Sequence, residues 1–395
     1  MNTVVHRLIY LLLLAFVLSG CRSPFAPDGL LAASATDQSA DRSDHDWVME
    51  GQNPQRNRAT SDQLALPLTI AQELQVGGDT QFGSPVGVAD GLVFIEGGQS
   101  LHALSLDGEE QWSFNLPGFY ISPTIHDNNV FVRAESGETG YVMAIRADTG
   151  LRSWQYRFPK VGSSNNNIGG HVTSPVVVTH MVLVGADHYL HAFDVDSGEE
   201  RWVFELEDAI TSSATVADEV IFFTDLNYLY AVSLKDGSEQ WRFRSGDFSL
   251  SFAPVVSGEV VITTNQNVAY ALDRTTGEVI WSRDLPAETI IPGGAAGDKI
   301  YIKSTNQLFA LDRQTGEDLW SFQVVDYISL PAIAGDHIFV ISREGGQAKL
   351  YGLSEASGQE LWQSENTRLA NAAPVIAGGQ LYVRTIDGSV LVYRN

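Results

Sequence analysis

The sequence is poor in cysteine and in positive charge. Cys21 is the only cysteine among 395 residues, so no disulfide can form within the chain. The 24 lysine and arginine residues face 48 aspartate and glutamate residues, which gives a formal net charge of -24. This deficit argues against nucleic acid as a partner, because neutralisation of phosphates supplies the affinity of such complexes. Since the acidic residues are spread along the chain, they favour a role in solubility over a basic partner or a bound cation.

Signals of helices and of common catalytic sites are also missing. Beyond the N-terminal leader, no long stretch places apolar residues at helical spacing, which disfavours helices. The sequence contains no Gly-x-Ser-x-Gly elbow, no Walker loop and no His-Glu-x-x-His motif. His188 and His191 lie three residues apart, and we expect a packed or edge histidine at His191 rather than a metal ligand. We therefore assign no catalytic residue, no cofactor-binding residue and no metal ligand.

The N-terminal segment resembles the leader of a bacterial lipoprotein. Basic residues precede an apolar run from Leu8 to Leu18, which is too short for an ordinary membrane-spanning helix, and Leu18-Ser19-Gly20-Cys21 resembles a lipobox. We predict a signal peptide at 1–20, a lipid on Cys21 and a flexible tether at 21–46. The predicted location is extracytoplasmic, with the lipid anchored in a bacterial membrane, at the outer membrane or the cell surface. An ordinary signal peptide that contains a cysteine is the alternative.

Most of the remaining chain is a tandem repeat. Tryptophans recur at intervals of 39 to 48 residues, and each follows a glycine by four positions. The unit before Trp281 predicts four short strands, because β-branched runs such as Val260–Thr263 alternate with turns. Four strands in about 40 residues match one propeller blade. The tryptophans of the repeat are Trp112, Trp154, Trp202, Trp241, Trp281, Trp320 and Trp362.

The repeat contains eight units, one more than the number of its tryptophans. The sequence therefore predicts an all-β fold, an eight-bladed β-propeller of four-stranded antiparallel blades in residues 47–395. We place the second strand of each blade at Leu92–Ile95, Val130–Val132, Met181–Val184, Val220–Phe223, Val260–Thr263, Ile300–Lys303, Ile338–Ile341 and Leu381–Val383.

The eighth unit has no fourth strand in its own stretch of sequence. It runs through Leu381–Val383 and Val390–Tyr393 and reaches Asn395. The segment Pro67–Leu74, just before the first unit, has the pattern of a lone strand. We expect this N-terminal strand to complete the eighth blade, because closing the ring removes exposed sheet edges.

The repeated tryptophans are predicted to be structural. A tryptophan offers a large flat apolar surface, and its indole N–H needs a partner when it is buried. At one position per blade, it suits a wedge between adjacent sheets, and the alanine of the third strand suits a place where sheets approach closely. Stacking of a ligand on these rings is the alternative.

The pattern Ala-x-Asp-x-x-Thr-Gly-x-x-x-Trp, nearly intact at Ala271–Trp281 and Ala310–Trp320, resembles the repeat of the pyrroloquinoline-quinone (PQQ)-type eight-bladed propellers. The resemblance covers about residues 47–395, and Trp47–Arg56 looks like the segment that often precedes such repeats in bacteria. The same propeller serves redox enzymes and outer-membrane assembly factors of the BamB type, so the resemblance is more specific for fold than for function.

The resemblance to the BamB type implies a non-catalytic, protein-binding scaffold in the cell envelope, with an unidentified envelope protein as partner and the lipid on Cys21 as its link to the membrane. The alternative is a PQQ-binding or PQQ-dependent redox protein, with PQQ and Ca²⁺ as cofactors. In the dehydrogenases of this kind, PQQ stacks against a ring of two adjacent disulfide-bonded cysteines, which this chain cannot form. A sensor or a carbohydrate-binding module is a third possibility.

The candidate binding site lies where the repeat is interrupted. The connection after Trp154 is about ten residues longer than its equivalents, and it contains Asn165, Asn166, Asn167 and His171. The hairpins at Arg133–Gly140 and Arg343–Ala348 are also enlarged. In a meander of four strands these loops open on the same face, so they predict one rim that contacts a protein or a glycan. Surface insertions without a role are the alternative.

Overall fold

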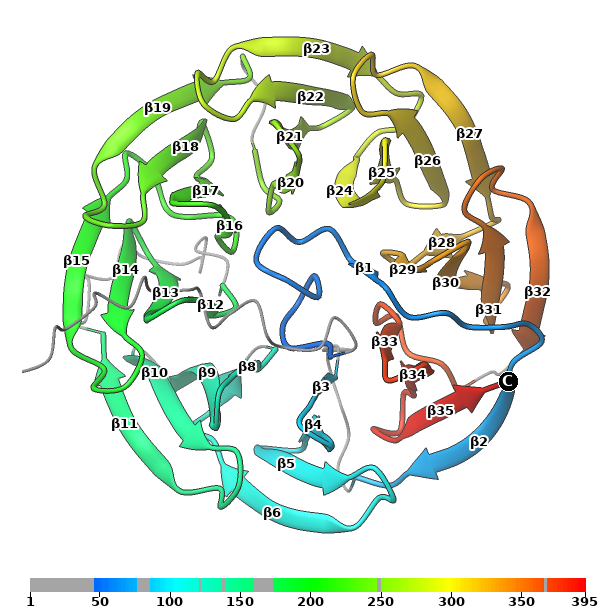
Figure 1. Ribbon diagram of the computed structural model, residues 1–395, viewed down its shortest axis with the longest axis horizontal. Coiled ribbons are helices and arrows are strands. Elements are labelled where there is room, and N and C mark those ends of the chain that lie inside the picture. Colours follow the sequence, from blue (N-terminus) through cyan, green and yellow to red (C-terminus); the bar gives the residue numbers. More distant parts are fainter. Residues whose placement is uncertain are drawn as a thin grey trace, which may run out of the picture. The chain divides into compact units, whose positions relative to one another are not determined.

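The computed structural model describes residues 46–76, 86–120, 122–136, 139–158, 173–246, 250–365 and 368–395. In these ranges the strands form eight sheets, which are arranged as blades around a central axis (Figure 1). No helix in the described ranges is long and apolar enough to cross a membrane. The eight-bladed, all-β fold predicted from the repeat is confirmed.

The first four blades follow the chain order, with the first strand of each blade innermost and the fourth outermost. Blade 2 carries the additional short strand β7 (Phe119–Tyr120), which pairs with β9. The strands are β3 (Gly87–Ala89), β4 (Leu92–Gly97), β5 (Ser100–Ser105) and β6 (Glu110–Asn115) in blade 1; β8 (Thr124–His126), β9 (Asn129–Ser136), β10 (Thr139–Arg146) and β11 (Arg152–Arg157) in blade 2; β12 (Val176–Val178), β13 (Met181–Ala186), β14 (Tyr189–Asp194) and β15 (Glu200–Glu205) in blade 3; and β16 (Thr215–Ala217), β17 (Val220–Thr224), β18 (Tyr228–Ser233) and β19 (Glu239–Arg244) in blade 4.

The next three blades repeat this order. Blade 7 gains two short strands, β1 (Ala59–Thr60), which pairs in parallel with β29, and β28 (Tyr327–Ile328), which pairs with β30. The strands are β20 (Val255–Ser257), β21 (Val260–Asn265), β22 (Val268–Asp273) and β23 (Val279–Asp284) in blade 5; β24 (Ile291–Ala296), β25 (Lys299–Lys303), β26 (Gln307–Asp312) and β27 (Asp318–Gln323) in blade 6; and β29 (Ala332–Ala334), β30 (His337–Glu344), β31 (Gln347–Ser354) and β32 (Glu360–Glu365) in blade 7.

Blade 8 closes the ring with strands from both ends of the propeller. Its inner strands are β33 (Val375–Ala377), β34 (Gln380–Arg384) and β35 (Val390–Arg394), and its outer strand is β2 (Thr69–Leu74). β2 pairs antiparallel with β35, from Thr69 opposite Arg394 to Leu74 opposite Val390. The predicted closure by an N-terminal strand is therefore confirmed, and β2 and β35 lie side by side in Figure 1.

The burial of each strand follows its position in the blade. The second strands are packed on both faces by neighbouring blades, so β21 is buried along its whole length and its sequence is rich in β-branched residues. The outer strands face solvent on one side, and β15 and β27 alternate exposed and half-buried residues. The hydrophobic core is accordingly divided into clusters between adjacent sheets, such as the one that joins Leu183 of blade 3 to Ile221 and Phe223 of blade 4.

Each of six tryptophans packs on a glycine of the next blade. A Cβ built on Gly150 would lie 2.7 Å from the Trp112 ring, and the six equivalent distances range from 2.4 to 2.7 Å. The same glycines hold φ between +67° and +73°, which also favours a residue without a Cβ. The indole N–H donates to a backbone carbonyl of the next blade over 2.8 to 3.1 Å. The pairs are Trp112–Gly150, Trp154–Gly198, Trp202–Gly237, Trp241–Gly277, Trp281–Gly316 and Trp320–Gly358.

The first and last members of this series of contacts between blades differ from the others, and both lie at the closing blade. Blade 8 has no tryptophan in its outer strand, and Leu74 and Gln72 of β2 take that place against Gly108 of blade 1. Trp362 of blade 7 lies beside blade 8, where it packs in a T-shaped arrangement on Tyr393 at 6.2 Å. The N-terminal strand therefore supplies both the missing strand and the missing contact with the next blade.

Candidate functional site

We call the side of the ring that carries the turns between second and third strands the hairpin face. The connections between blades lie on the same face. For example, the backbone N–H of Thr211, which follows β15, donates to the carbonyl of Thr224 at the end of β17. The enlarged hairpins predicted from the sequence are present as longer strands, because β9, β10, β30 and β31 have eight residues each where most of their equivalents have six. These hairpins belong to blades 2 and 7, which flank blades 1 and 8.

An arginine fixes each long hairpin to its neighbour. In blade 2, buried Arg133 donates to the carbonyl of Gly185 in blade 3 and forms an ion pair with Glu135 at 2.6 Å. Burial lowers the pKa of Arg133, and Glu135 acts in the opposite direction. In blade 7, Arg343 donates to the Asn371 side chain at 2.8 Å and to the Leu369 carbonyl at 3.0 Å. These contacts tie blade 2 to blade 3, and blade 7 to the connection that leads into blade 8, at the hairpin face.

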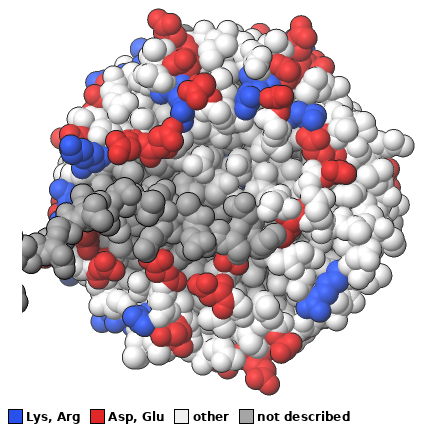
Figure 2. Space-filling model, viewed as in Figure 1, with Lys and Arg blue, Asp and Glu red and all other residues white. Residues whose placement is uncertain are grey.

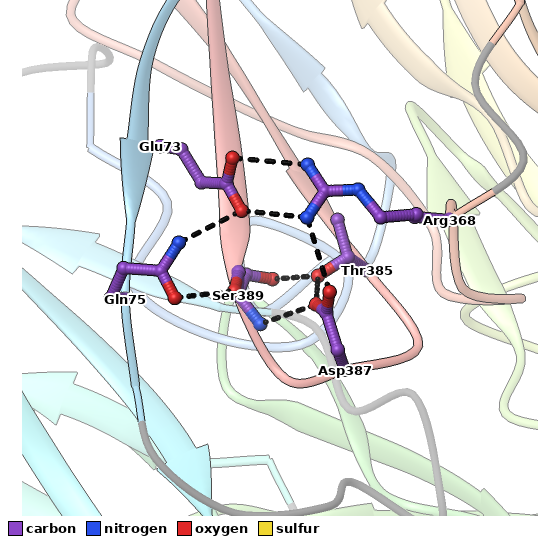
Figure 3. A network of polar contacts seen from close by, with 6 residues as sticks. All are labelled: Glu73, Gln75, Arg368, Thr385, Asp387 and Ser389. Carbon is purple, nitrogen blue, oxygen red and sulfur yellow. Dashed lines mark hydrogen bonds and ion pairs between the residues drawn. The ribbon is translucent and has the colours of Figure 1, made fainter.

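A polar network continues this rim over blade 8 (Figure 3). Arg368 forms two hydrogen bonds with the Glu73 carboxylate of β2, at 2.8 and 3.0 Å, and a third with Asp387 at 3.1 Å. The hydrogen bond from Arg368 lowers the pKa of Glu73. Asp387 also has a lowered pKa, chiefly because it accepts a hydrogen bond from the Thr385 hydroxyl. We call Glu73, Arg368 and Asp387 the closure network, because they join the N-terminal strand to the last hairpin.

The centre of the ring is occupied by the chain itself. Residues 47–62, the axial segment, lie in blue at the centre of Figure 1 and contact the inner part of all eight blades. In blade order the contacts are Trp47 with Val88, Val48 with Ile125, Glu50 with Ser174, Pro54 with Val216, Gln55 with Val256, Asn57 with Ala295, Arg58 with Ile333 and Asp62 with Gly379.

The axial segment also carries a buried charge cluster. Arg56 pairs with Glu50 at 3.0 Å, and the Ser174 hydroxyl donates to the same carboxylate oxygen at 2.9 Å. Arg58 donates from Nε to the Pro331 carbonyl at 2.7 Å, and its guanidinium lies over the Trp47 ring at 5.6 Å. Sequence reasoning missed this cluster. The available signal was a pair of arginines in a chain that is otherwise short of positive charge, within a segment that does not follow the repeat.

Charges elsewhere are distributed rather than gathered. Figure 2 shows Asp and Glu around the ring on the face it presents, with Lys or Arg beside several of them. Among the ion pairs of the described residues, Arg274 contacts Asp218 and Glu259, and Arg313 lies 2.8 Å from Asp298.

The residues singled out from the sequence fall into two groups. Cys21, the loop residues Asn165, Asn166 and Asn167, and His171 lie outside the described residues. The two neighbouring histidines are described, and they do not share a site. His188 lies in the turn before β14, whereas His191 is buried on β14, 2.9 Å from Glu200, and burial lowers its pKa.

Two observations concern the cofactors of the quinoprotein dehydrogenases, PQQ and Ca²⁺. In the ranges that the structure covers, no group of three or more His, Cys, Asp or Glu could hold a metal ion such as Ca²⁺. A cysteine pair for PQQ is excluded by the sequence, since Cys21 is the only cysteine. We therefore derive no step through PQQ.

Comparison with protein families identifies the repeat. The family model described as "Outer membrane protein assembly factor BamB" matches residues 53–228, 141–283, 226–326 and 310–394, which together span almost the whole propeller. No curated protein matches the chain.

Solved structures share the fold at low sequence identity. BamB from Moraxella catarrhalis is 16% identical, with a TM-score of 0.66 over 83% of this chain and 100% of that chain. The quinohemoprotein alcohol dehydrogenase ADHIIG from Pseudomonas putida HK5 is 14% identical, with a TM-score of 0.71 over 90% of this chain and 81% of that chain. The computationally designed Ika8 protein is 14% identical, with a TM-score of 0.69 over 82% of this chain and 100% of that chain. An outer membrane protein assembly factor, an alcohol dehydrogenase and a computationally designed protein thus have the same architecture, so these likenesses concern the fold alone.

Proposed function

We propose, from the premise that this chain belongs to the family of the outer membrane protein assembly factor BamB, that it is a non-catalytic scaffold that binds proteins in the cell envelope. The lipid on Cys21 and residues 21–46 would hold the propeller at a bacterial membrane, outside the cytoplasm. In this proposal the protein needs no cofactor.

One observation carries the proposal: the long hairpins of blades 2 and 7 rise on one face of a closed ring. An arginine fixes the strands of each hairpin to a neighbouring blade. Binding residues are concentrated on loops that a rigid scaffold positions. The connection that contains Asn165–Asn167 follows blade 2 in the chain, and we include it in the proposed surface on the basis of the sequence.

Site-specific crosslinking in cells tests this assignment. A photoreactive amino acid at Gly345, in the turn of the long hairpin of blade 7, should crosslink to envelope proteins. The matched control is Gly297, an exposed turn between first and second strands, on the other side of the ring. Crosslinks to the same proteins from both positions, or crosslinks from Gly297 alone, would exclude the hairpin face as the binding surface.

Two further measurements test the remaining parts of the proposal. Cys21→Ser should release the protein from the membrane fraction, because it removes the predicted site of lipidation. Addition of PQQ and Ca²⁺ to the purified protein should give neither tight binding nor dye reduction. Binding with turnover would replace the scaffold with the redox alternative.

A further inference from the structure

Two buried arginines of the axial segment keep unused hydrogen-bond donors. Arg56 and Arg58 are 7% and 4% exposed. Arg56 uses Nη2 for Glu50, and Arg58 uses Nε for Pro331, but Nη1 of Arg56 and Nη2 of Arg58 are buried without a partner. Leaving a charged donor unsatisfied costs more than leaving a neutral one, so such atoms in a folded protein require an explanation.

Both arginines line a cavity of about 170 Å³ beside the axis. The rest of its wall combines the Glu50 carboxylate with apolar side chains, among them Phe252, Ile291 and Leu330. The cavity is too large for a single water, whose share of the liquid is about 30 Å³. Phe252 and Leu330 belong to connections between blades, which places the cavity at the hairpin-face end of the axis.

The charges in this cavity do not balance. One carboxylate, Glu50, faces two guanidinium groups, so the cluster carries one excess positive charge. Burial acts to raise the pKa of Glu50, but the charge and hydrogen bond of Arg56 outweigh it and leave the pKa below its usual value. Burial lowers the pKa of Arg58 to about 10, so Arg58 remains charged at neutral pH. A buried charge without a counter-ion is strongly unfavourable, so an anion at this point would stabilise the cluster.

The backbone holds the two arginines in place. Arg56 and Arg58 both have φ of +57°, a left-handed conformation that residues with a side chain rarely adopt. Gly51 makes room for this arrangement, since a Cβ on it would lie 3.0 Å from the Cβ of Arg56, and its carbonyl accepts from the Arg58 N–H at 3.1 Å. Conformations of this kind persist where the surroundings determine them, and they are frequent at ligand sites.

We propose that this cavity binds a carboxylate that carries a short branched apolar group. The carboxylate would bind the guanidinium groups of Arg56 and Arg58, and the apolar group would contact Phe252, Ile291 and Leu330. A free branched acid and the C-terminal residue of a peptide both offer this chemistry. The site is independent of the crosslinking surface, so either proposal can fail alone.

Calorimetric titration of the purified full chain tests the site with two pairs of probes. 4-Methylpentanoate represents the free acid, and N-acetyl-leucine represents a peptide C-terminus; the matching amides lack the charge. We expect one acid molecule to bind per chain and the amides to bind at least about 10-fold more weakly, because charged hydrogen bonds are lost. Stronger binding of one acid than of the other shows whether the ligand is a free branched acid or the C-terminal residue of a peptide. Equal binding of acids and amides, or no binding of either acid, overturns the proposal.

Two variants of the charge cluster should change acid binding in opposite directions. Arg56→Gln should weaken acid binding by about 10- to 100-fold, because it removes a charged donor. Glu50→Gln should strengthen binding, because it removes the only carboxylate that competes for the arginines. If Arg56→Gln does not fold, Ala253→Phe provides a second test, since Ala253 lines the cavity and a larger side chain would fill it. Unchanged binding in Ala253→Phe, or weaker binding in Glu50→Gln, contradicts the assignment.

Discussion

Gly316 and Gly297 lie in two turns of the same blade and differ in what surrounds them. Both have positive φ, +70° at Gly316 and +54° at Gly297. A Cβ on Gly316 would lie 2.7 Å from the Trp281 ring, whereas a Cβ on Gly297 would meet no atom within 4 Å. Substitution with alanine therefore separates two costs: Gly297→Ala introduces backbone strain alone, and Gly316→Ala introduces strain together with a collision between blades.

The size of each effect follows from these contacts. An alanine in the left-handed region costs about 1–2 kcal/mol. Overpacking a well-packed interface costs a further ~1–3 kcal/mol. We expect Gly297→Ala to lower the free energy of unfolding by about 1–2 kcal/mol and Gly316→Ala by about 2–5 kcal/mol. Urea unfolding followed by far-ultraviolet circular dichroism measures both free energies of unfolding. An unchanged m-value, the slope of that free energy against urea concentration, shows that the same structure unfolds in each variant.

A double-mutant cycle assigns the difference to the tryptophan. In a Trp281→Leu background the ring is absent, so Gly316→Ala should cost little more than Gly297→Ala. The coupling between the two substitutions should be about 1–3 kcal/mol, the size of the removed collision. Equal losses from the two glycine substitutions in the natural chain would refute the interpretation. An identical loss from Gly316→Ala in both backgrounds would refute it too.

Three further predictions concern the ring and its buried charges. Arg368→Met should cost about 1 kcal/mol at neutral pH. The substitution should also reduce the loss of stability in acid. The lowered pKa of Glu73 stabilises the fold above the unfolded pKa, and this stabilisation is lost as pH falls through the folded pKa. Urea unfolding at several acidic pH values measures this loss, and an unchanged loss in Arg368→Met contradicts the prediction. Burial lowers the pKa of Lys303 from 10.5 to about 8, so the unfolded chain binds more protons between these values and stability should rise with pH. Lys303→Met should abolish that rise in the same assay, and a persistent rise would exclude Lys303 as its source. Deletion of residues 60–76 should collapse the melting temperature, whereas deletion of 22–38, in the predicted tether, should not; equal melting of both proteins in calorimetry would refute ring closure.

The blades could be predicted because nearly the same contact between neighbouring sheets recurs in the successive units. Six of the eight contacts between neighbouring sheets place a flat ring on one side and a residue without a Cβ on the other, so Gly and Trp recur with the period of the blade. The sequence shows Gly277 and Trp281 four residues apart, but Trp281 packs on Gly316 of the next blade. Periodicity therefore predicted the architecture correctly, while the partner of each residue became visible only in three dimensions.

The polar sites could not be predicted in the same way. Glu73 and Arg368 lie 295 positions apart, and no local pattern connects an acid of β2 with an arginine that precedes the inner strands of the last blade. The arginines of the axial segment precede the repeat and share none of its spacing. Their environment depends on inner strands from all parts of the ring, so only the closed fold brings Arg58 beside Pro331 and Glu50 beside Ser174.

The axial segment and the closing strand are one continuous piece of chain, so we expect the two sites to influence each other. Residues 47–62 contact the inner part of each blade, and β2 completes the eighth blade from the outside. A ligand that binds only the folded cluster of Arg56 and Arg58 stabilises the state in which the axial segment is in place. The same state positions β2 for its pairing with β35. Occupancy of the cavity should therefore strengthen ring closure, which connects a small buried site to the integrity of the whole scaffold.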